Sequence, residues 1–152
     1  MLALDDIVEK ETIFSLIDKS DYPLDEETAR NYSEVGEDWR RNGARALYHK
    51  YYAARVYAEL FRKYQTFDYA RNAAVDFDKA AKDAQLCSWI DISVHCRKFA
   101  VFYYAYALSL SPSDPTLVDP LEERRGLERA RAFNKKMISR WKAHLQMMSA
   151  RQ

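Results

Sequence analysis

The chain has 152 residues, 48% of them hydrophobic and 31% charged, with three glycines and four prolines. This length fits one domain, and the composition excludes collagen-like and disordered chains. The net charge is +1, the first residues lack the basic start of a signal peptide, and the apolar run Phe99 to Leu110 is too short to span a bilayer, so we expect a soluble, cytoplasmic protein without a membrane partner.

Two short helices are predicted at the N-terminal end. Apolar residues spaced three and four apart predict a helix from about Leu4 to Asp18, which ends before Pro23. A cluster of acidic residues that begins at Asp25 starts a second helix. Gly36 and Gly43 interrupt the pattern that follows and leave open whether this stretch forms one helix or two.

Three longer helices are predicted in the middle of the chain, at residues 44–65, 68–86 and 88–110. The second has a face of alanines, which lets a neighbouring backbone approach closely. The third is apolar nearly all round from Phe99 onward, which predicts the central helix. Cys87 and Cys96 lie on opposite faces of one helix, about 13 Å apart, so we expect no disulfide between them.

A last helix is predicted at residues 119–150, where Asp119 caps its start and Pro120 lies in its first turn. No segment alternates as a strand does, so we expect an all-α fold of five to seven helices. The expected arrangement is one domain over residues 1–152, either a bundle or a short stack of antiparallel helical hairpins. It has an acidic helical segment at 1–38, core helices at 44–110 and a basic C-terminal helix at 119–150.

Charge is distributed unevenly along the chain. Residues 1–38 contain twelve acidic and three basic residues, whereas residues 121–152 contain three acidic and nine basic ones. The simplest expectation is that the two ends lie near each other and their fields partly cancel. The alternative is a basic surface that awaits an acidic protein or a nucleic acid. Its residues would be Arg124, Arg125, Arg129, Lys135, Lys136 and Arg140.

Tyrosines are concentrated on the first of the three longer helices. Tyr48, Tyr52 and Tyr57 cannot all face the core from a single helix. Because tyrosine is enriched at protein interfaces, we predict that they form a partner-binding surface together with Arg55 on the same helix. The partner would be another protein or a second copy of the chain. The alternative is that these rings fill space between helices, with their hydroxyls reaching water.

Candidate chemistry is limited to two patterns. Asp91 and His95 share a helix face, but a zinc or di-iron site needs at least three ligands, so we predict a surface pair and no metal or cofactor. Arginine and histidine recur four apart at Arg45 and His49 and at Arg140 and His144, in a pattern similar to that of HEPN ribonucleases. That family places four to six residues between the two, and both instances here have three.

The segment 81–112 resembles a tetratricopeptide repeat. Its second helix matches the family at four positions: Ala100, Tyr104, Ala107 and Pro112. In this alignment Asp91 stands where an aromatic residue is usual, and His95 and Cys96 occupy the turn between the two helices. An earlier copy rests on five residues: Ala54, Tyr57, Ala73, Phe77 and Ala80. The resemblance implies stacked antiparallel hairpins with a C-terminal solvating helix that bind peptides or other proteins.

The sequence therefore favours a non-enzymatic interaction module or adaptor that binds a protein partner through its tyrosine-lined surface and its basic C-terminal helix. The alternative is an RNA- or DNA-binding protein that uses the same basic helix. Two further alternatives remain: a HEPN-like ribonuclease, and an inhibitor whose acidic stretch at 25–38 imitates a nucleic-acid backbone.

Overall fold

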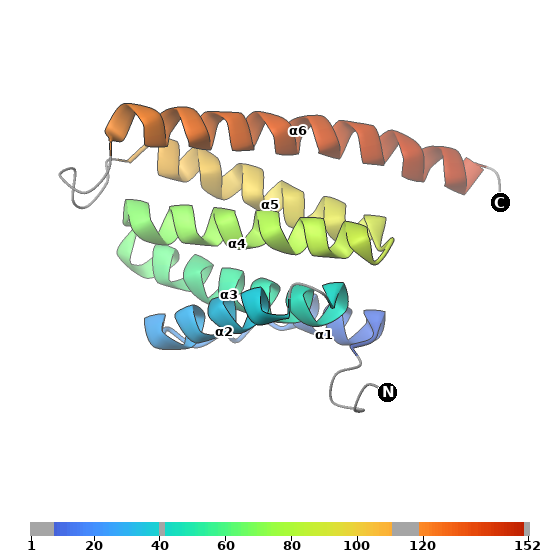
Figure 1. Cartoon of the computed structure of the whole chain (residues 1–152), viewed down its shortest axis with the longest axis horizontal. Coiled ribbons are helices and arrows are strands. Elements are labelled where there is room, and N and C mark those ends of the chain that lie inside the picture. The colour runs from blue at the N-terminus through green and yellow to red at the C-terminus, as the bar shows by residue number, and fades with distance from the viewer. Residues whose placement is uncertain (1–7, 40–41, 111–118, 151–152) are drawn as a thin grey trace.

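A computed structural model describes residues 8–39, 42–110 and 119–150 of the chain, which form six α-helices (Figure 1). The helices are α1 (Lys10–Asp18), α2 (Glu26–Asp38), α3 (Gly43–Tyr64), α4 (Phe67–Leu86), α5 (Ile90–Leu108) and α6 (Pro120–Ala150). These described residues contain no strand, which confirms the predicted all-α fold class. The predicted start of the first helix lies partly in residues 1–7, outside the described part.

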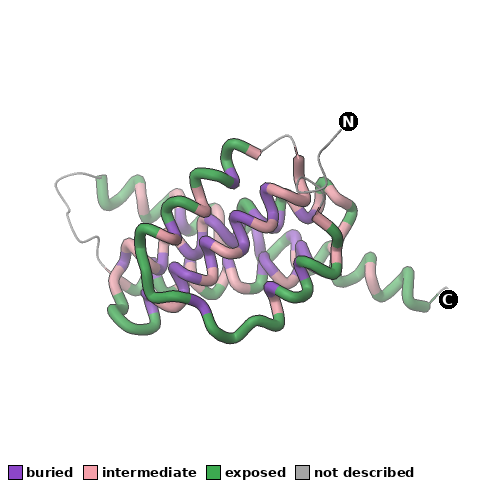
Figure 2. The backbone as a smooth tube through the Cα atoms, turned by 90° about the horizontal axis from the view of Figure 1, so that it is seen from below, coloured by how far each residue is buried: buried purple, intermediate pink, exposed green. Residues whose placement is uncertain are grey.

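Successive helices from α2 to α6 run antiparallel and form a stack of hairpins (Figure 1). Each of α3, α4 and α5 packs against the helix before it and the helix after it, and α1 packs on α3. The C-terminal part of α6 extends beyond the other helices (Figures 1 and 2). Stacking of this kind buries one side of each terminal helix and leaves its opposite side to solvent.

Side-chain caps set several helix starts. The Asp25 carboxylate accepts the Glu27 N–H at 3.1 Å, and the Asp119 carboxylate accepts the Leu121 N–H at 3.0 Å. Asn42 caps α3 by accepting the Arg45 N–H at 3.2 Å. The chain between Asp25 and Tyr64 therefore forms two helices and not one, because α2 ends at Asp38 and α3 begins after this cap.

The alignment with a tetratricopeptide repeat places a turn at His95 and Cys96, and the structure has none there, whereas the helix predicted at residues 88–110 is present as α5. The helix α5 runs unbroken through both residues, and the chain turns instead between α4 and α5, where Ser88 adopts a positive φ of 62°. The apolar stripe that includes Ile92 and Cys96 is continuous and buried against the core, so a break there would expose it. The hairpin is thus present but begins at a different place. Both cysteines are free, but they do not lie on one helix as expected, because Cys87 follows the end of α4 and Cys96 belongs to α5.

Alanines of α4 give the core its close packing. Six of them are fully buried: Ala70, Ala73, Ala74, Ala80, Ala81 and Ala84. Figure 2 shows such buried positions concentrated where helices face each other. The prediction that residues 88–110 form the central helix is wrong in part, because Phe102 and Tyr106 of α5 remain exposed. This helix has packed neighbours in α4 and α6, and a third side stays open.

The acidic and basic segments lie at opposite ends of the stack (Figure 1). The helix α2 packs on α3, and α6 packs on α5. The helix α4 in turn packs on both α3 and α5. The expectation that the two ends of the chain meet and cancel their charges is therefore wrong. The reason is that each helix from α3 to α6 packs on the helix before it in the sequence, so α2 and α6 lie at the two ends of the stack.

Two buried cations connect the stacked helices. Lys50 on α3 places its Nζ 2.7 Å from Glu37 Oε1 on α2 and 3.8 Å from Asp76 Oδ1 on α4. Arg97 on α5 donates to Asn134 Oδ1 on α6 at 2.8 Å and to Gln85 Oε1 on α4 at 3.1 Å. Each cation thereby joins three consecutive helices.

We expect Gly36→Ala to destabilise the fold although glycine is a poor helix former. A Cβ at this position would lie 3.0 Å from Cγ and Cε of Lys50, whose side chain is held by Glu37 and Ser33. Alanine gains about 1 kcal/mol in helix propensity, and overpacking costs about 1–3 kcal/mol. Urea denaturation should therefore show a net loss of about 1 kcal/mol. Gly126→Ala, where nothing lies within 4 Å of the added Cβ, is the matched control and should stabilise. An equal gain in both variants would contradict the proposed clash.

Candidate functional site

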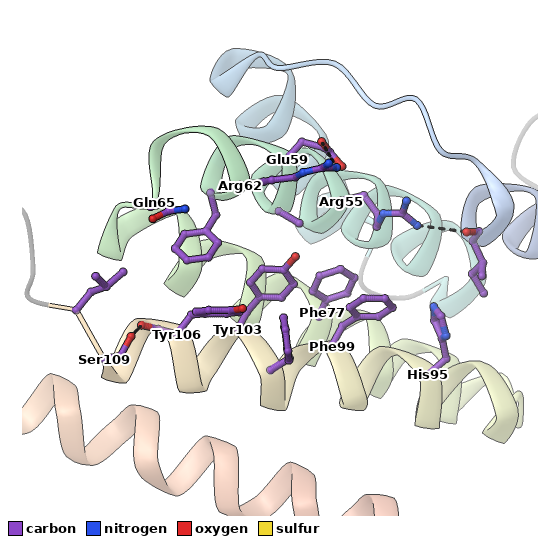
Figure 3. Close-up of a pocket in the computed structure, with 15 residues that line it drawn as sticks. Arg55, Glu59, Arg62, Gln65, Phe77, His95, Phe99, Tyr103, Tyr106 and Ser109 are labelled. Carbon is purple, nitrogen blue, oxygen red and sulfur yellow. Dashed lines mark hydrogen bonds and ion pairs between the residues drawn. The ribbon is translucent and has the colours of Figure 1, made fainter.

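A groove of about 760 Å³ lies between α3 and α5, with Phe77 of α4 at its floor (Figure 3). The helix α4 packs on both α3 and α5, and side chains of α3 and α5 meet beside it, as Phe61 does with Tyr103 at 6.0 Å. No helix of the described chain lies between them. The groove is the open side of α5 described above.

Aromatic rings form most of the groove. The ring of Phe77 stacks on Phe99 with 5.0 Å between centroids and on Tyr103 with 5.8 Å. Phe61 of α3 contacts Tyr106 of α5 at 5.0 Å across the groove. These offset and tilted pairs hold the wall in a fixed geometry.

Two aromatic residues of this groove remain accessible. Phe102 is 52% exposed and Tyr106 is 40% exposed, and their rings meet edge to face at 4.8 Å. Exposed rings beside a concave apolar surface are typical of a binding site.

Charged side chains line the rim on α3. The Arg55 guanidinium donates to the Ile17 and Lys19 carbonyls at 3.3 and 2.9 Å, so it ties the end of α1 to α3. Arg62 lies 4.0 Å from Glu59 and is otherwise largely exposed to solvent. Arg62 is therefore the rim cation that is free to meet a negatively charged group.

One end of the groove is formed by His95. Its Nε2 lies 3.3 Å from the Tyr51 hydroxyl, and Arg55 donates to the same hydroxyl at 3.1 Å. Burial, with Arg55 and Lys98 nearby, lowers the pKa of His95. Burial also raises the pKa of Tyr51 to about 12. This end of the groove is thus a neutral hydrogen-bonding pair beside a fixed arginine at neutral pH.

The tyrosines expected to bind a partner do not line this groove. The ring of Tyr52 stacks on Tyr32 of α2 at 4.0 Å, and Tyr48 is half-buried against the core. Tyr57 is only 7% exposed, so it offers little surface to a partner in the folded chain. Helix α2 covers this face of α3, and the rings fill the space between the helices. Of the four predicted residues, only Arg55 lines the groove.

The groove residues Phe102 and Tyr106 were missed as binding residues. The sequence carries a signal for them, because α5 is apolar nearly all round from Phe99. A helix of that kind needs neighbours on every side. With neighbours on two sides only, its remaining apolar face is left open.

The predicted basic residues of α6 separate into two groups. Arg124 donates to the Leu108 carbonyl at 2.9 Å and pairs with Glu128 at 3.3 Å, so it stabilises the end of α5. The others are exposed: Arg125, Arg129, Lys135, Lys136 and Arg140. They follow the side of α6 that faces away from the stack.

The three pairs considered for chemistry lie in different surroundings. Asp91 forms an ion pair with Lys10 of α1 at 3.0 Å, whereas His95 faces Tyr51, so the two have different partners. His49 is buried between Tyr32 and Tyr48, and burial, with Arg45 nearby, lowers its pKa to about 4. His144 lies on the projecting part of α6, against the ring of Trp141.

Neither a metal site nor a membrane span is found in the described residues. No three histidine, cysteine or acidic residues there come together in a metal-binding arrangement. None of the six helices is both long and apolar enough to cross a bilayer. Comparison of the chain with family models, with curated proteins and with solved structures gave no match.

Proposed function

We propose that the chain is a protein-interaction module that binds a peptide segment of a partner in the groove between α3 and α5. The observation that carries this proposal is the pair of exposed rings, Phe102 and Tyr106, beside a groove of about 760 Å³. The hairpin stack also supports it, since tetratricopeptide-like stacks, which this chain resembles, bind peptides or other proteins. The proposal keeps the predicted function and places it on a different face of α3.

The groove favours a peptide with apolar or aromatic side chains next to an acidic residue. The rings of Phe99, Phe102 and Tyr106 offer apolar surface to such side chains. Arg62, whose ion pair among the described residues is the 4.0 Å contact with Glu59, offers a cation to a carboxylate at the rim. Residues that bury an aromatic ring at an interface contribute most of the binding energy.

The double variant Phe102→Ala/Tyr106→Ala is expected to weaken peptide binding by at least about tenfold, because each lost ring contact of this kind costs more than 1 kcal/mol. The measurement begins with selection of peptides from a random displayed library on the immobilised chain. The affinity of the selected peptides is then measured by fluorescence polarisation. We expect the selected sequences to combine aromatic or aliphatic residues with an aspartate or glutamate.

A matched control uses the same two residue types outside the groove. Phe133 on α6 and Tyr64 on α3 are 48% and 53% exposed, and neither lines the groove. Phe133→Ala/Tyr64→Ala should leave the affinity within about twofold of the original. If the library gives no enriched peptide, or if both double variants lose binding equally, the groove is not the binding site.

A further inference from the structure

The outer side of α2 carries a row of exposed acidic and polar residues. Glu27, Asn31, Glu34 and Asp38 follow one another at steps of four, three and four, which places them on a single line along the helix. None of the three carboxylates forms an ion pair with another described residue. We call this row the acidic stripe.

The outer side of α6 carries a matching row of the opposite charge. Arg125, Arg129, Ala132 and Lys136 repeat the steps of four, three and four, and Arg140 extends the row by one more turn. All five are exposed, and none of the four cations forms an ion pair within the described part of the chain. We call this row the basic stripe.

The two stripes have the geometry to pair, but not within one molecule. Each four-residue row spans about 16 Å at a rise of 1.5 Å per residue, so charges on one row can register with charges on the other. In a single chain they lie at opposite ends of the stack, separated by α3, α4 and α5 (Figure 1). Exposed Val35 next to the acidic stripe and Met147 on the line of the basic stripe add apolar contact surface.

We propose that the acidic stripe of one copy docks on the basic stripe of a second copy, so that chains associate end to end. This continues the helical stack, because α2 of one molecule takes the place of the next helix after α6 of the other. The contact joins two different surfaces, so the bound pair still presents one free stripe of each sign, the basic stripe on one copy and the acidic stripe on the other. Assembly can then continue beyond a dimer, and it goes beyond the peptide binding proposed above.

Association through charged stripes depends on salt. At an ionic strength of about 0.01 M the Debye length is about 30 Å, and at about 1 M it falls to about 3 Å. The full chain is first treated with nuclease until no absorbance from nucleic acid remains. At low salt, sedimentation velocity should then show larger species as the protein concentration rises. The same series at high salt should give a single monomeric species.

Charge reversal tests which surfaces make the contact. Glu27→Lys/Glu34→Lys changes the net charge of the acidic stripe from −3 to +1, and Arg129→Glu/Lys136→Glu changes that of the basic stripe from +4 to zero. All four side chains are exposed and lack ion pairs among the described residues, so circular dichroism should show both variants folded. Each variant alone should associate at least about tenfold more weakly than the original chain, because several like-charge contacts replace favourable ones.

Mixing the two reversed variants is the deciding measurement. The mixture again contains ends of opposite charge, so larger species should return at low salt and contain both variants. The proposal is overturned if the original chain stays monomeric at low salt, if either reversed variant assembles as well as the original, or if the mixture fails to assemble. Loss of the larger species on nuclease treatment would assign the basic stripe to nucleic acid.

Discussion

Replacing Arg97 by alanine is expected to lower the free energy of unfolding by about 3–5 kcal/mol, the range found when one partner of a buried ion pair is removed. Arg97 is 1% exposed, and its guanidinium lies 3.8 Å from Asp78 Oδ1 on α4 while it donates to Asn134 on α6. The variant leaves the Asp78 carboxylate without this cation and the buried Asn134 amide oxygen without this donor. Urea denaturation followed by circular dichroism measures the loss.

The consequence should extend to the attachment of α6. Arg97 links α4, α5 and α6, so limited proteolysis of Arg97→Ala should cut within α6 sooner than in the original chain. Arg71→Ala is the matched control, because Arg71 also joins α4 to α6 through Glu123 at 3.5 Å, but in a half-exposed position. The Arg71→Ala substitution should lower the free energy of unfolding by no more than about 1 kcal/mol. A similarly small loss of unfolding free energy in Arg97→Ala would mean that the cost of burying the Arg97 charge offsets the stabilisation from its hydrogen bonds.

Helix periodicity made the core helices predictable from the sequence. The stripe that includes Leu47, Tyr51 and Ala54 predicted α3, and all three residues are buried. Local capping residues such as Asp119 predicted a helix start to within a residue. Both signals act over one or two turns of chain, so they need no knowledge of the tertiary fold.

The groove was harder to predict from the sequence, because it depends on which side of α5 has no neighbouring helix. A helix that is apolar all round is compatible with full burial and with one open side, and the sequence of α5 alone does not distinguish them. Phe99 and Phe102 belong to the same apolar run, yet the first packs on Phe77 and the second is half exposed. Only the order of stacking decides which of them a neighbour covers.

The burial of charged residues also depended on the order in which the helices stack, which the sequence does not show directly. Lys50 and Arg97 look like ordinary surface residues in the sequence, and both are buried because acceptors come from helices on two sides. The opposite charges of the two chain ends suggested mutual attraction, but nearest-neighbour stacking keeps them apart. Opposite charges in two segments of a sequence therefore indicate a contact between those segments only once the order in which the helices pack is known.

Lys50→Met is expected to cost about 3–5 kcal/mol at neutral pH, because it removes the charge and keeps most of the side-chain volume. Lys50 is 2% exposed, and Asp76 beside it is 4% exposed. Glu37 retains an ion pair with Lys79 at 2.6 Å, so the nearest group left without a cation is Asp76. The substitution also acts on Asp83, whose pKa is raised by burial and lowered by Lys50. Urea denaturation at pH 8 measures this loss.

The pH dependence of Lys50→Met identifies the cause. Burial raises the pKa of Asp76 to about 6 even though Lys50 lowers it, so removing Lys50 raises this pKa further. An unfolded aspartate has a pKa of about 3.9, and between that value and the folded pKa only the folded chain holds the proton. Stability of the variant should therefore rise as pH falls from 8 to about 5, and more steeply than in the original chain.

The double variant Lys50→Met/Asp76→Asn separates charge from packing. Asparagine keeps the shape of Asp76 and stays neutral, so the double variant should recover at least half of the lost stability at pH 8. It should also lose most of the added pH dependence. The opposite result would be a loss of unfolding free energy in Lys50→Met that is equal at pH 5 and pH 8 and is not rescued by Asp76→Asn. The loss would then come from packing around Gly36, whose missing Cβ makes room for the Lys50 stem.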